Sequence, residues 1–212
     1  KHPFPKDIED MLRRLQHKPG AITTEIAMDA FDWERGERLD IGRKKLIALW
    51  NRAQSELCEV RGSDIHGRGV YATRLIPEKT KIIEYVGELV DKKESDRRAN
   101  AQHAKSLKTG DAAVYIFTLS KTWDIDGNVP WNTARLINHS CNPNCEAFIE
   151  GRKIFIYSLR EIAEGEELTF DYGFDVDCYE DHPCLCGKEG CVGYIVSRSQ
   201  WAELESRLKE KA

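Results

Sequence analysis

The cysteines of this chain restrict its possible folds more than any other feature. There are seven, an odd number, so a framework made entirely of disulfides would leave one thiol over. Three of them lie within eight residues, in the segment Cys184-Leu185-Cys186-Gly187-Lys188-Glu189-Gly190-Cys191. Thiols at this spacing, linked through glycines, are typical of a tetrahedral metal site in a reducing compartment. The alternative is three unpaired reduced cysteines in a terminal loop. The metal hypothesis also needs a fourth ligand from elsewhere in the chain.

Composition argues against several classes of protein. The 212 residues are 41% hydrophobic and 32% charged, which suits a protein with a packed core and does not fit a disordered chain. No run approaches the roughly 18 apolar residues of a membrane helix, and no N-terminal apolar segment resembles a signal peptide. The net charge of −4 argues against direct nucleic-acid binding, because proteins of that class are usually basic. We therefore expect neither a membrane nor a nucleic-acid partner.

The chain contains two regions with different patterns of apolar residues. Residues 1–58 show the apolar spacing of helices, with a short middle helix near 24–31, and we expect a helical N-terminal segment there. After residue 58, β-rich runs alternate with turn sequences, and one polar helix is predicted near 92–107. The predicted strands lie at 69–73, 81–90, 114–119, 153–158 and 167–170. This pattern predicts a mainly β protein with small curled sheets.

The first polar motif is the segment Ile65-His66-Gly67-Arg68-Gly69-Val70-Tyr71. Its two glycines allow the backbone to approach a ligand closely, and Arg68 is suited to pairing with a carboxylate. The segment lacks the third glycine of a dinucleotide fingerprint. When the segment is taken alone, a plain turn before a strand is the better interpretation.

The second and third motifs are the segments at 135–145 and 165–173. The second contains Asn138-His139-Ser140-Cys141, whose polar groups suit either turns and caps or a hydrolytic nucleophile with His139 as its base. Neighbouring residues rarely point at one another, so the nucleophile interpretation is the weaker one. The third motif is an alternating strand that ends in Asp171-Tyr172-Gly173, and by itself it reads as a core strand followed by a turn.

Taken together, the order and spacing of these motifs resemble the SET-domain family of protein-lysine methyltransferases. The resemblance runs from about residue 60 to residue 194, and it does not include residues 1–58. It implies a SET fold of small curled β-sheets around a knot-like crossing. Together with the helical spacing of residues 1–58, it divides the chain into four parts. These are a helical segment at 1–58, the SET domain at 59–175, a post-SET zinc-binding segment at 176–196 and a C-terminal helix at 197–212.

The resemblance also implies a cofactor and a reaction. S-adenosylmethionine would be held by His66, Gly67, Arg68, Tyr115, Asn138 and His139. A methyl group would pass from its sulfonium to a lysine amine, with Tyr172 and Tyr115 as the catalytic residues. Tyr172 would position the amine rather than act as a base, because the pKa of tyrosine is near 10. Lysine must lose its proton before it can attack, and an aromatic, poorly solvated channel that includes Phe174 favours the neutral amine.

Relatives that share the terminal cysteines supply the fourth zinc ligand from the cysteine after Asn-His-Ser. The implied structural zinc ligands are therefore Cys141, Cys184, Cys186 and Cys191, with Cys145 and Cys178 as fallback ligands. In relatives the residue two before the catalytic tyrosine sets the number of methyl groups added. Here it is Phe170, which implies di- or trimethylation because phenylalanine lacks the hydroxyl that restrains the amine.

The resemblance leaves the substrate and the compartment open. It implies a protein or peptide carrying a target lysine, such as a histone tail, with the nucleus as location in a eukaryote and the cytoplasm in a bacterium. A non-catalytic SET-fold module that binds a peptide or partner is the alternative. Trp131 departs from the family pattern, because a glycine is usual there, and we expect it near the peptide groove.

Overall fold

The strands of this protein are short, and several of them bury every second residue. The computed structural model describes residues 31–32, 37–38, 48, 51–109, 115–129 and 131–211. In β11 (Lys153–Ser158), the side chains of Ile154, Ile156 and Ser158 are buried and those between them are more exposed. Successive side chains of a strand point to opposite faces, so this alternation turns the isoleucines into the core.

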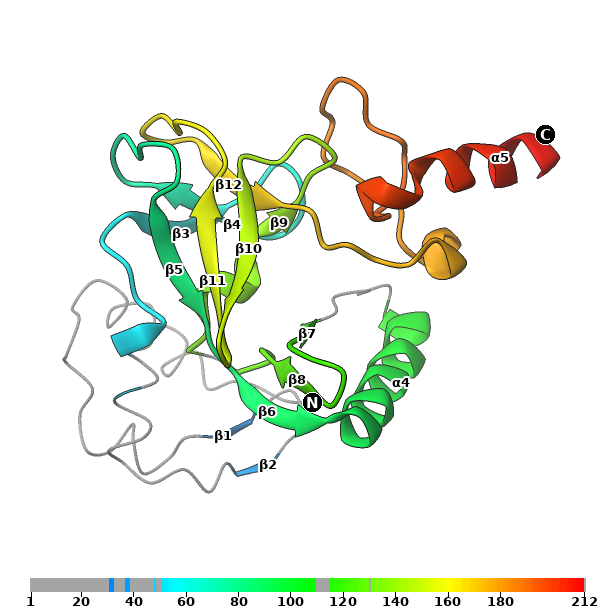
Figure 1. Cartoon of the computed structure of the whole chain (residues 1–212), viewed down its shortest axis with the longest axis horizontal. Coiled ribbons are helices and arrows are strands. Elements are labelled where there is room, and N and C mark those ends of the chain that lie inside the picture. The colour runs from blue at the N-terminus through cyan, green and yellow to red at the C-terminus, as the bar shows by residue number, and fades with distance from the viewer. Residues whose placement is uncertain are drawn as a thin grey trace.

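The described strands form four small sheets (Figure 1). β1 (Phe31–Asp32) pairs with β2 (Glu37–Arg38), and the three larger sheets run in the orders β3-β4-β12-β9, β10-β11-β5 and β6-β8-β7. The remaining bounds are β3 (Cys58–Gly62), β4 (Arg68–Ala72), β5 (Lys81–Tyr85), β6 (Glu88–Asp91), β7 (Ile116–Thr118), β8 (Trp123–Asp126), β9 (Asn138–His139), β10 (Cys145–Glu150) and β12 (Glu167–Phe170). All the neighbouring pairs are antiparallel except β12 with β9, which is parallel.

One apolar core joins the three larger sheets. Its fully buried members include Val70 of β4, Ile154 and Ile156 of β11, and Leu168 of β12. Burying a side chain of this size contributes about 1.5–3 kcal/mol, so these residues hold the sheets against one another. The parallel β9–β12 pair therefore rests on a rigid support.

Helix α4 (Lys92–Thr109) is attached to the β6-β8-β7 sheet, beside which it lies in Figure 1. Asp91 caps its start, because the carboxylate accepts a hydrogen bond of 2.8 Å from the Glu94 N–H. The Arg98 guanidinium, only 13% exposed, forms ion pairs of 2.8 Å with Glu88 and 2.7 Å with Asp126 on the sheet. These charge-assisted bonds fix α4, whose sequence is mostly polar, to strands β6 and β8.

The C-terminal part has a small core of its own. A 3₁₀ helix (Val176–Asp181) leads into the cysteine-rich tail, and α5 (Trp201–Lys211) follows and extends away from the sheets (Figure 1). Val176, Tyr179, Val196 and Leu204 form a buried cluster that joins the two ends of the tail. None of the described helices has both the length and the apolarity that crossing a membrane requires.

The mainly β prediction is confirmed, and the structure corrects it in detail. The run expected at 81–90 is divided into β5, which pairs with β11, and β6, which pairs with β8. Gly87 lies between them and packs so tightly that an added Cβ would lie 2.3 Å from the Asp126 carbonyl oxygen. Phe31 lies in β1, so the middle helix predicted for 24–31 is wrong at that residue, where pairing with β2 provides the backbone hydrogen bonds. The remainder of that helix, and most of the helical segment predicted for 1–58, lie outside the described residues.

Candidate active site and metal centre

Two segments more than 30 residues apart meet where β12 runs parallel to β9. In this pair Phe170 lies opposite His139, and the chain beyond β12 continues to Tyr172. The Tyr172 N–H donates to Nδ1 of His139 at 3.2 Å, and the Tyr172 hydroxyl donates to the Ile137 carbonyl at 2.9 Å. The two rings meet edge to face with centroids 5.4 Å apart. Tyr172 is therefore fixed on both its backbone and its side chain by the 137–139 segment.

The glycine loop between β3 and β4 is held by Asn138. Its side-chain nitrogen lies 3.2 Å from the His66 carbonyl, 3.1 Å from the Arg68 carbonyl and 2.8 Å from the Glu167 carboxylate. Gly67, which lies between His66 and Arg68, has a φ of +53°, a left-handed conformation that glycine adopts without strain. The amide group of Asn138 thus serves to shape the loop, and the loop backbone lies at the edge of a cavity.

The cavity has a volume of about 380 Å³, which is within the usual range for small-ligand sites. It brings together every residue that the family resemblance assigns to the cofactor, to catalysis or to product specificity: His66, Gly67, Arg68, Tyr115, Asn138, His139, Phe170 and Tyr172. Phe174, expected in the lysine channel, also lines it. Cys184 of the C-terminal tail lines the same cavity, so the tail forms part of the wall.

A continuous row of rings lines one side of this cavity. Centroids are 6.2 Å apart between Phe117 and Phe170, 5.0 Å between Phe170 and Tyr172, and 5.6 Å between Tyr172 and Phe174. The row ends at His182, whose ring lies 4.6 Å from that of Phe174. Such a surface excludes water. It favours neutral groups, and groups that pack against rings, over strongly hydrated ions.

Tyr115 is positioned through its backbone and its ring. Its carbonyl accepts hydrogen bonds from the Tyr85 hydroxyl at 2.8 Å and from the Gly127 N–H at 2.9 Å. Only glycine fits at position 127, since an added Cβ would lie 2.4 Å from the Tyr85 hydroxyl oxygen. The Arg135 guanidinium stands 5.1 Å from the centre of the Tyr115 ring, in cation–π contact with it.

The surroundings of two titratable groups keep them neutral. Burial raises the pKa of the Tyr172 phenol well above its ordinary value, and neighbouring Tyr115 acts in the same direction. Burial lowers the pKa of the His139 imidazole, and the Asp171 carboxylate opposes that change. At neutral pH the site therefore presents a phenol and an uncharged imidazole.

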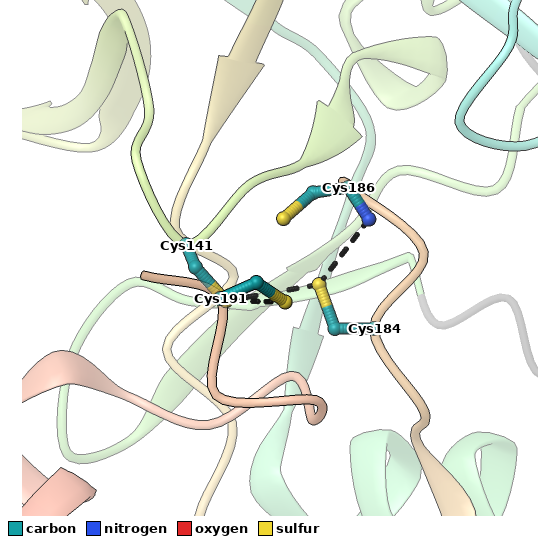
Figure 2. Close-up of side chains that lie close together, drawn as sticks. All are labelled: Cys141, Cys184, Cys186 and Cys191. Carbon is teal, nitrogen blue, oxygen red and sulfur yellow. Dashed lines mark hydrogen bonds between the residues drawn. The ribbon is translucent and has the colours of Figure 1, made fainter. Parts of the chain in front are cut away.

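Four cysteines converge next to this cavity (Figure 2). Cys141 follows β9, and Cys184, Cys186 and Cys191 come from the C-terminal tail. All four sulfur atoms lie within 4.8 Å of one another, and Cys141 Sγ is 3.7 Å from the sulfurs of both Cys184 and Cys191. Tetrahedral zinc with Zn–S bonds of about 2.3 Å places its sulfurs roughly 3.8 Å apart, so the donor set and its spacing fit this metal.

Backbone N–H groups donate to two sulfurs of the cluster. The N–H of Cys186 donates to the Cys184 sulfur at 3.5 Å, and the N–H of Gly193 donates to the Cys191 sulfur at 3.4 Å. Burial raises the pKa of the Cys141 thiol to about 11. Burial also acts to raise the pKa of Cys186, but hydrogen bonds from the surrounding backbone outweigh it and lower that pKa to about 6. A bound cation would displace the remaining protons.

The two fallback cysteines are not members of the cluster. Cys145 is only 1% exposed in the main core, and the thiol of Cys178 lies 3.1 Å from the Asp175 carbonyl. Trp131 is also placed differently from the expectation, because it is 5% exposed and does not line the cavity. It therefore offers little surface to a ligand.

Several cavity residues were not found by the sequence reasoning. Tyr85 lies in the strand predicted at 81–90, and its local pattern gives no sign of a role in the cavity. His182, Leu185 and Ile195 line the cavity from the tail. Their only sequence signal is their position close to Cys184 and Cys191, which matters once those cysteines fold towards β9.

Comparison with known proteins gives consistent matches. The family model described as SET domain matches residues 67–173. A histone-lysine N-methyltransferase from Chaetomium globosum, described as H3 lysine-4 specific, is 39% identical over 167 residues, which are 75% of this chain and 15% of that protein. Proteins with the same description from Yarrowia lipolytica and Candida albicans are each 42% identical over 63% of this chain, and the matches cover 12% and 13% of their lengths. The chain thus spans less than a sixth of the length of these curated relatives.

Proposed function

The chain belongs to the SET-domain family, and on that premise we propose that it is an S-adenosylmethionine-dependent protein-lysine N-methyltransferase. The observation that carries the proposal is the convergence of the glycine loop, the 137–139 segment, Tyr115 and Tyr172 on one cavity. These groups come from separate parts of the sequence, and a partner-binding module has no need of them in one place. Their arrangement suits a site that must hold two reactants.

The cavity residues fit the chemistry of the cofactor. Its carboxylate calls for a cationic partner, which Arg68 offers, and its nucleoside calls for hydrogen bonds, which the backbone near His66, Gly67, Asn138 and His139 offers. Tyr115 adds an aromatic surface whose position is fixed by Tyr85 and Gly127. When bound, S-adenosylmethionine supplies an electrophilic methyl group on a positively charged sulfur.

The chain's own residues would prepare the lysine. An ordinary lysine has a pKa near 10.4 and is almost fully charged at neutral pH, so its nitrogen has no lone pair to use. The row of rings from Phe117 to Phe174 lowers that pKa by desolvation, which favours the free amine. The Tyr172 hydroxyl donates its hydrogen to the Ile137 carbonyl, so its oxygen can serve as an acceptor for an amine N–H. Tyr172 then orients the nitrogen without taking its proton.

The four-cysteine cluster would hold one structural zinc. Its ligands would be Cys141, Cys184, Cys186 and Cys191, a closed thiolate set with no open position. Zinc would join the tail to β9 and so keep His182 and Leu185 at the cavity wall. Its role is therefore to complete the site rather than to take part in methyl transfer.

Phe170 would set the product. It lies between Phe117 and Tyr172 and carries no hydroxyl that could hold the amine in one orientation. A methylated amine can then rotate its lone pair back towards the donor. We therefore propose di- or trimethylation.

The relatives suggest where to look for the substrate. They are described as histone-lysine N-methyltransferases specific for lysine 4 of histone H3, and we propose a histone tail or a similar basic segment as the substrate class. A basic tail suits a chain whose net charge is −4. In a eukaryote this activity would belong to nuclear chromatin. In a bacterium it would belong to the cytoplasm.

A methylation assay with labelled S-adenosylmethionine tests the proposal. The substrate would be a histone H3 tail peptide, and the matched control would be the same peptide with arginine in place of lysine 4. Label in the first peptide and not in the second supports both the activity and the site. A peptide array would follow if lysine 4 is not modified. Cofactor binding by calorimetry separates the enzyme from a non-catalytic binding module, because the latter has no need to bind S-adenosylmethionine.

A further inference from the structure

We propose that the imidazole of His139 is a positioning residue held in one tautomer, with Nε2–H donating to the Cys141 sulfur and Nδ1 accepting from the Tyr172 N–H. It would connect the metal cluster to the backbone of the proposed catalytic tyrosine through a single ring. The significance of this arrangement for methyl transfer rests on the proposed function. The tautomer and the two hydrogen bonds themselves do not depend on that function.

The Nδ1 side of the ring determines where the hydrogen lies. A backbone N–H can only donate, and that of Tyr172 points at Nδ1 over 3.2 Å. Nδ1 must therefore present its lone pair. A neutral imidazole has one donor and one acceptor nitrogen, so the hydrogen lies on Nε2.

The Nε2 side meets sulfur. Nε2 lies 3.7 Å from the Cys141 sulfur, within hydrogen-bond range for that atom. A cysteine that ligates a metal is a thiolate and can only accept, so the donor on Nε2 is the matching partner. The ring is 4% exposed, which leaves water little access to compete for either nitrogen.

Two other acceptors face the ring, the Phe170 carbonyl and the Asp171 carboxylate. The Phe170 carbonyl accepts the Ser140 N–H at 3.3 Å, and the Asp171 carboxylate is also already engaged. Its Oδ1 is 3.7 Å from Nδ1, farther than the Tyr172 nitrogen, and accepts the Gly173 N–H at 2.9 Å. Its Oδ2 accepts the N–H of Arg198 at 3.2 Å. These bonds satisfy Asp171 without a proton from His139.

Two hydrogen bonds of the His139 ring thus connect the cysteine cluster to the loop at Tyr172. A shift of the Cys141 sulfur on metal loss would be passed to the ring and from there to the Tyr172 N–H. The parallel pairing of His139 with Phe170 limits how far the ring can move to absorb such a shift. Metal occupancy would in this way affect the placement of the tyrosine directly, in addition to its effect on the order of the tail.

Nitrogen-15 NMR of histidine-labelled protein loaded with zinc tests the tautomer. The chain has six histidines, and the signals of His139 are identified by their absence from the spectrum of His139→Asn. The expected result is a neutral ring with its hydrogen on Nε2. A hydrogen on Nδ1, or a rapid average of the two tautomers, would overturn the proposal.

Zinc release to a chromophoric chelator tests the bond to sulfur. The side chain of His139→Asn ends near the position of Nδ1 and cannot reach the thiolate, whereas that of His139→Gln can place an amide N–H near the position of Nε2. Loss of such an outer-shell donor typically costs 10- to 100-fold in metal affinity, so we expect His139→Asn to release zinc about 10-fold faster. His139→Gln should remain within about threefold of wild type.

His66→Asn is the matched control, because it removes another imidazole of the same cavity that is not a member of the four-cysteine cluster, and its zinc release should be unchanged. Equal release by the two His139 variants, or a wild-type rate in His139→Asn, would refute the donor role of Nε2. If His139→Asn does not fold, the signals of His139 are identified by their absence from the spectrum of His139→Gln, and the NMR result on the wild-type protein decides. Neither readout uses cofactor or peptide, so failure of the methylation assay would leave both standing.

Discussion

Replacing Tyr172 with phenylalanine separates the structural from the chemical role of one hydroxyl. The change removes the hydroxyl that donates a hydrogen bond of 2.9 Å to the Ile137 carbonyl. Leaving a buried carbonyl without its donor costs about 1–3 kcal/mol. For a domain of this size each 1 kcal/mol lowers Tm by roughly 2–4 °C, so we expect Tyr172→Phe to melt several degrees below wild type and still fold.

The effect on methyl transfer should be larger. Loss of one preorganised polar group at a reacting centre typically reduces kcat by about 10²–10³, equivalent to roughly 3–4 kcal/mol in the barrier. The affinity for S-adenosylmethionine should change only a few-fold, because the ring and its contact with His139 remain. The measurements are turnover with a histone peptide, calorimetry with the cofactor and thermal melting of both proteins.

Tyr179→Phe provides the matched control, because it removes a buried tyrosine's bond to Glu180 outside the cavity. It should retain wild-type turnover. Wild-type turnover in Tyr172→Phe would remove that hydroxyl from the mechanism. Because burial raises the pKa of Tyr172, the phenol stays protonated up to its ordinary value near 10. The plot of kcat/KM against pH should therefore rise as the substrate lysine loses its proton, with no fall below pH 10 from ionisation of Tyr172.

Three further changes test other parts of the site. Cys186→Ser should lower the metal content from about one zinc per chain to a small fraction, as elemental analysis would show, while Cys178→Ser retains its zinc. Retention of zinc by Cys186→Ser would contradict the ligand assignment. Phe170→Tyr should shift the products towards monomethylation by about 2- to 10-fold, the equivalent of one hydrogen bond of 0.5–1.5 kcal/mol, and mass spectrometry would detect it. A wild-type protein that stops at one methyl group in excess cofactor would exclude Phe170 as the determinant. Asn144→Ala removes two donated bonds to the 166–167 segment and one accepted from β12, and should cost about 2–4 kcal/mol in denaturant unfolding. A loss below 1 kcal/mol would show that water replaces these bonds.

The sequence determined the local elements whose periodicity is strong. The alternating apolar residues of 153–158 and 167–170 correspond to β11 and β12 with the same bounds. The polar run near 92 corresponds to the start of α4. By contrast β3, β8, β9 and β10 were not foreseen as strands, because β9 has two residues and the other three do not alternate cleanly between buried and exposed. Short elements of this kind depend on their partners rather than on their own residues.

The sequence also supplied the chemical groups of the site, through motifs whose residue types and spacing are fixed by the covalent chain. Which groups meet was decided by the tertiary structure. The β9–β12 pairing brings His139 to Tyr172, and packing of the tail brings Cys184 to Cys141 across 43 positions of sequence. The physical reason is that periodicity and spacing act over a few residues, whereas closing a loop of 30 or more residues is driven by burial of a shared core. The ring of His139 shows the limit most clearly, because its tautomer depends on one backbone N–H and one sulfur that only the folded chain places on its two sides.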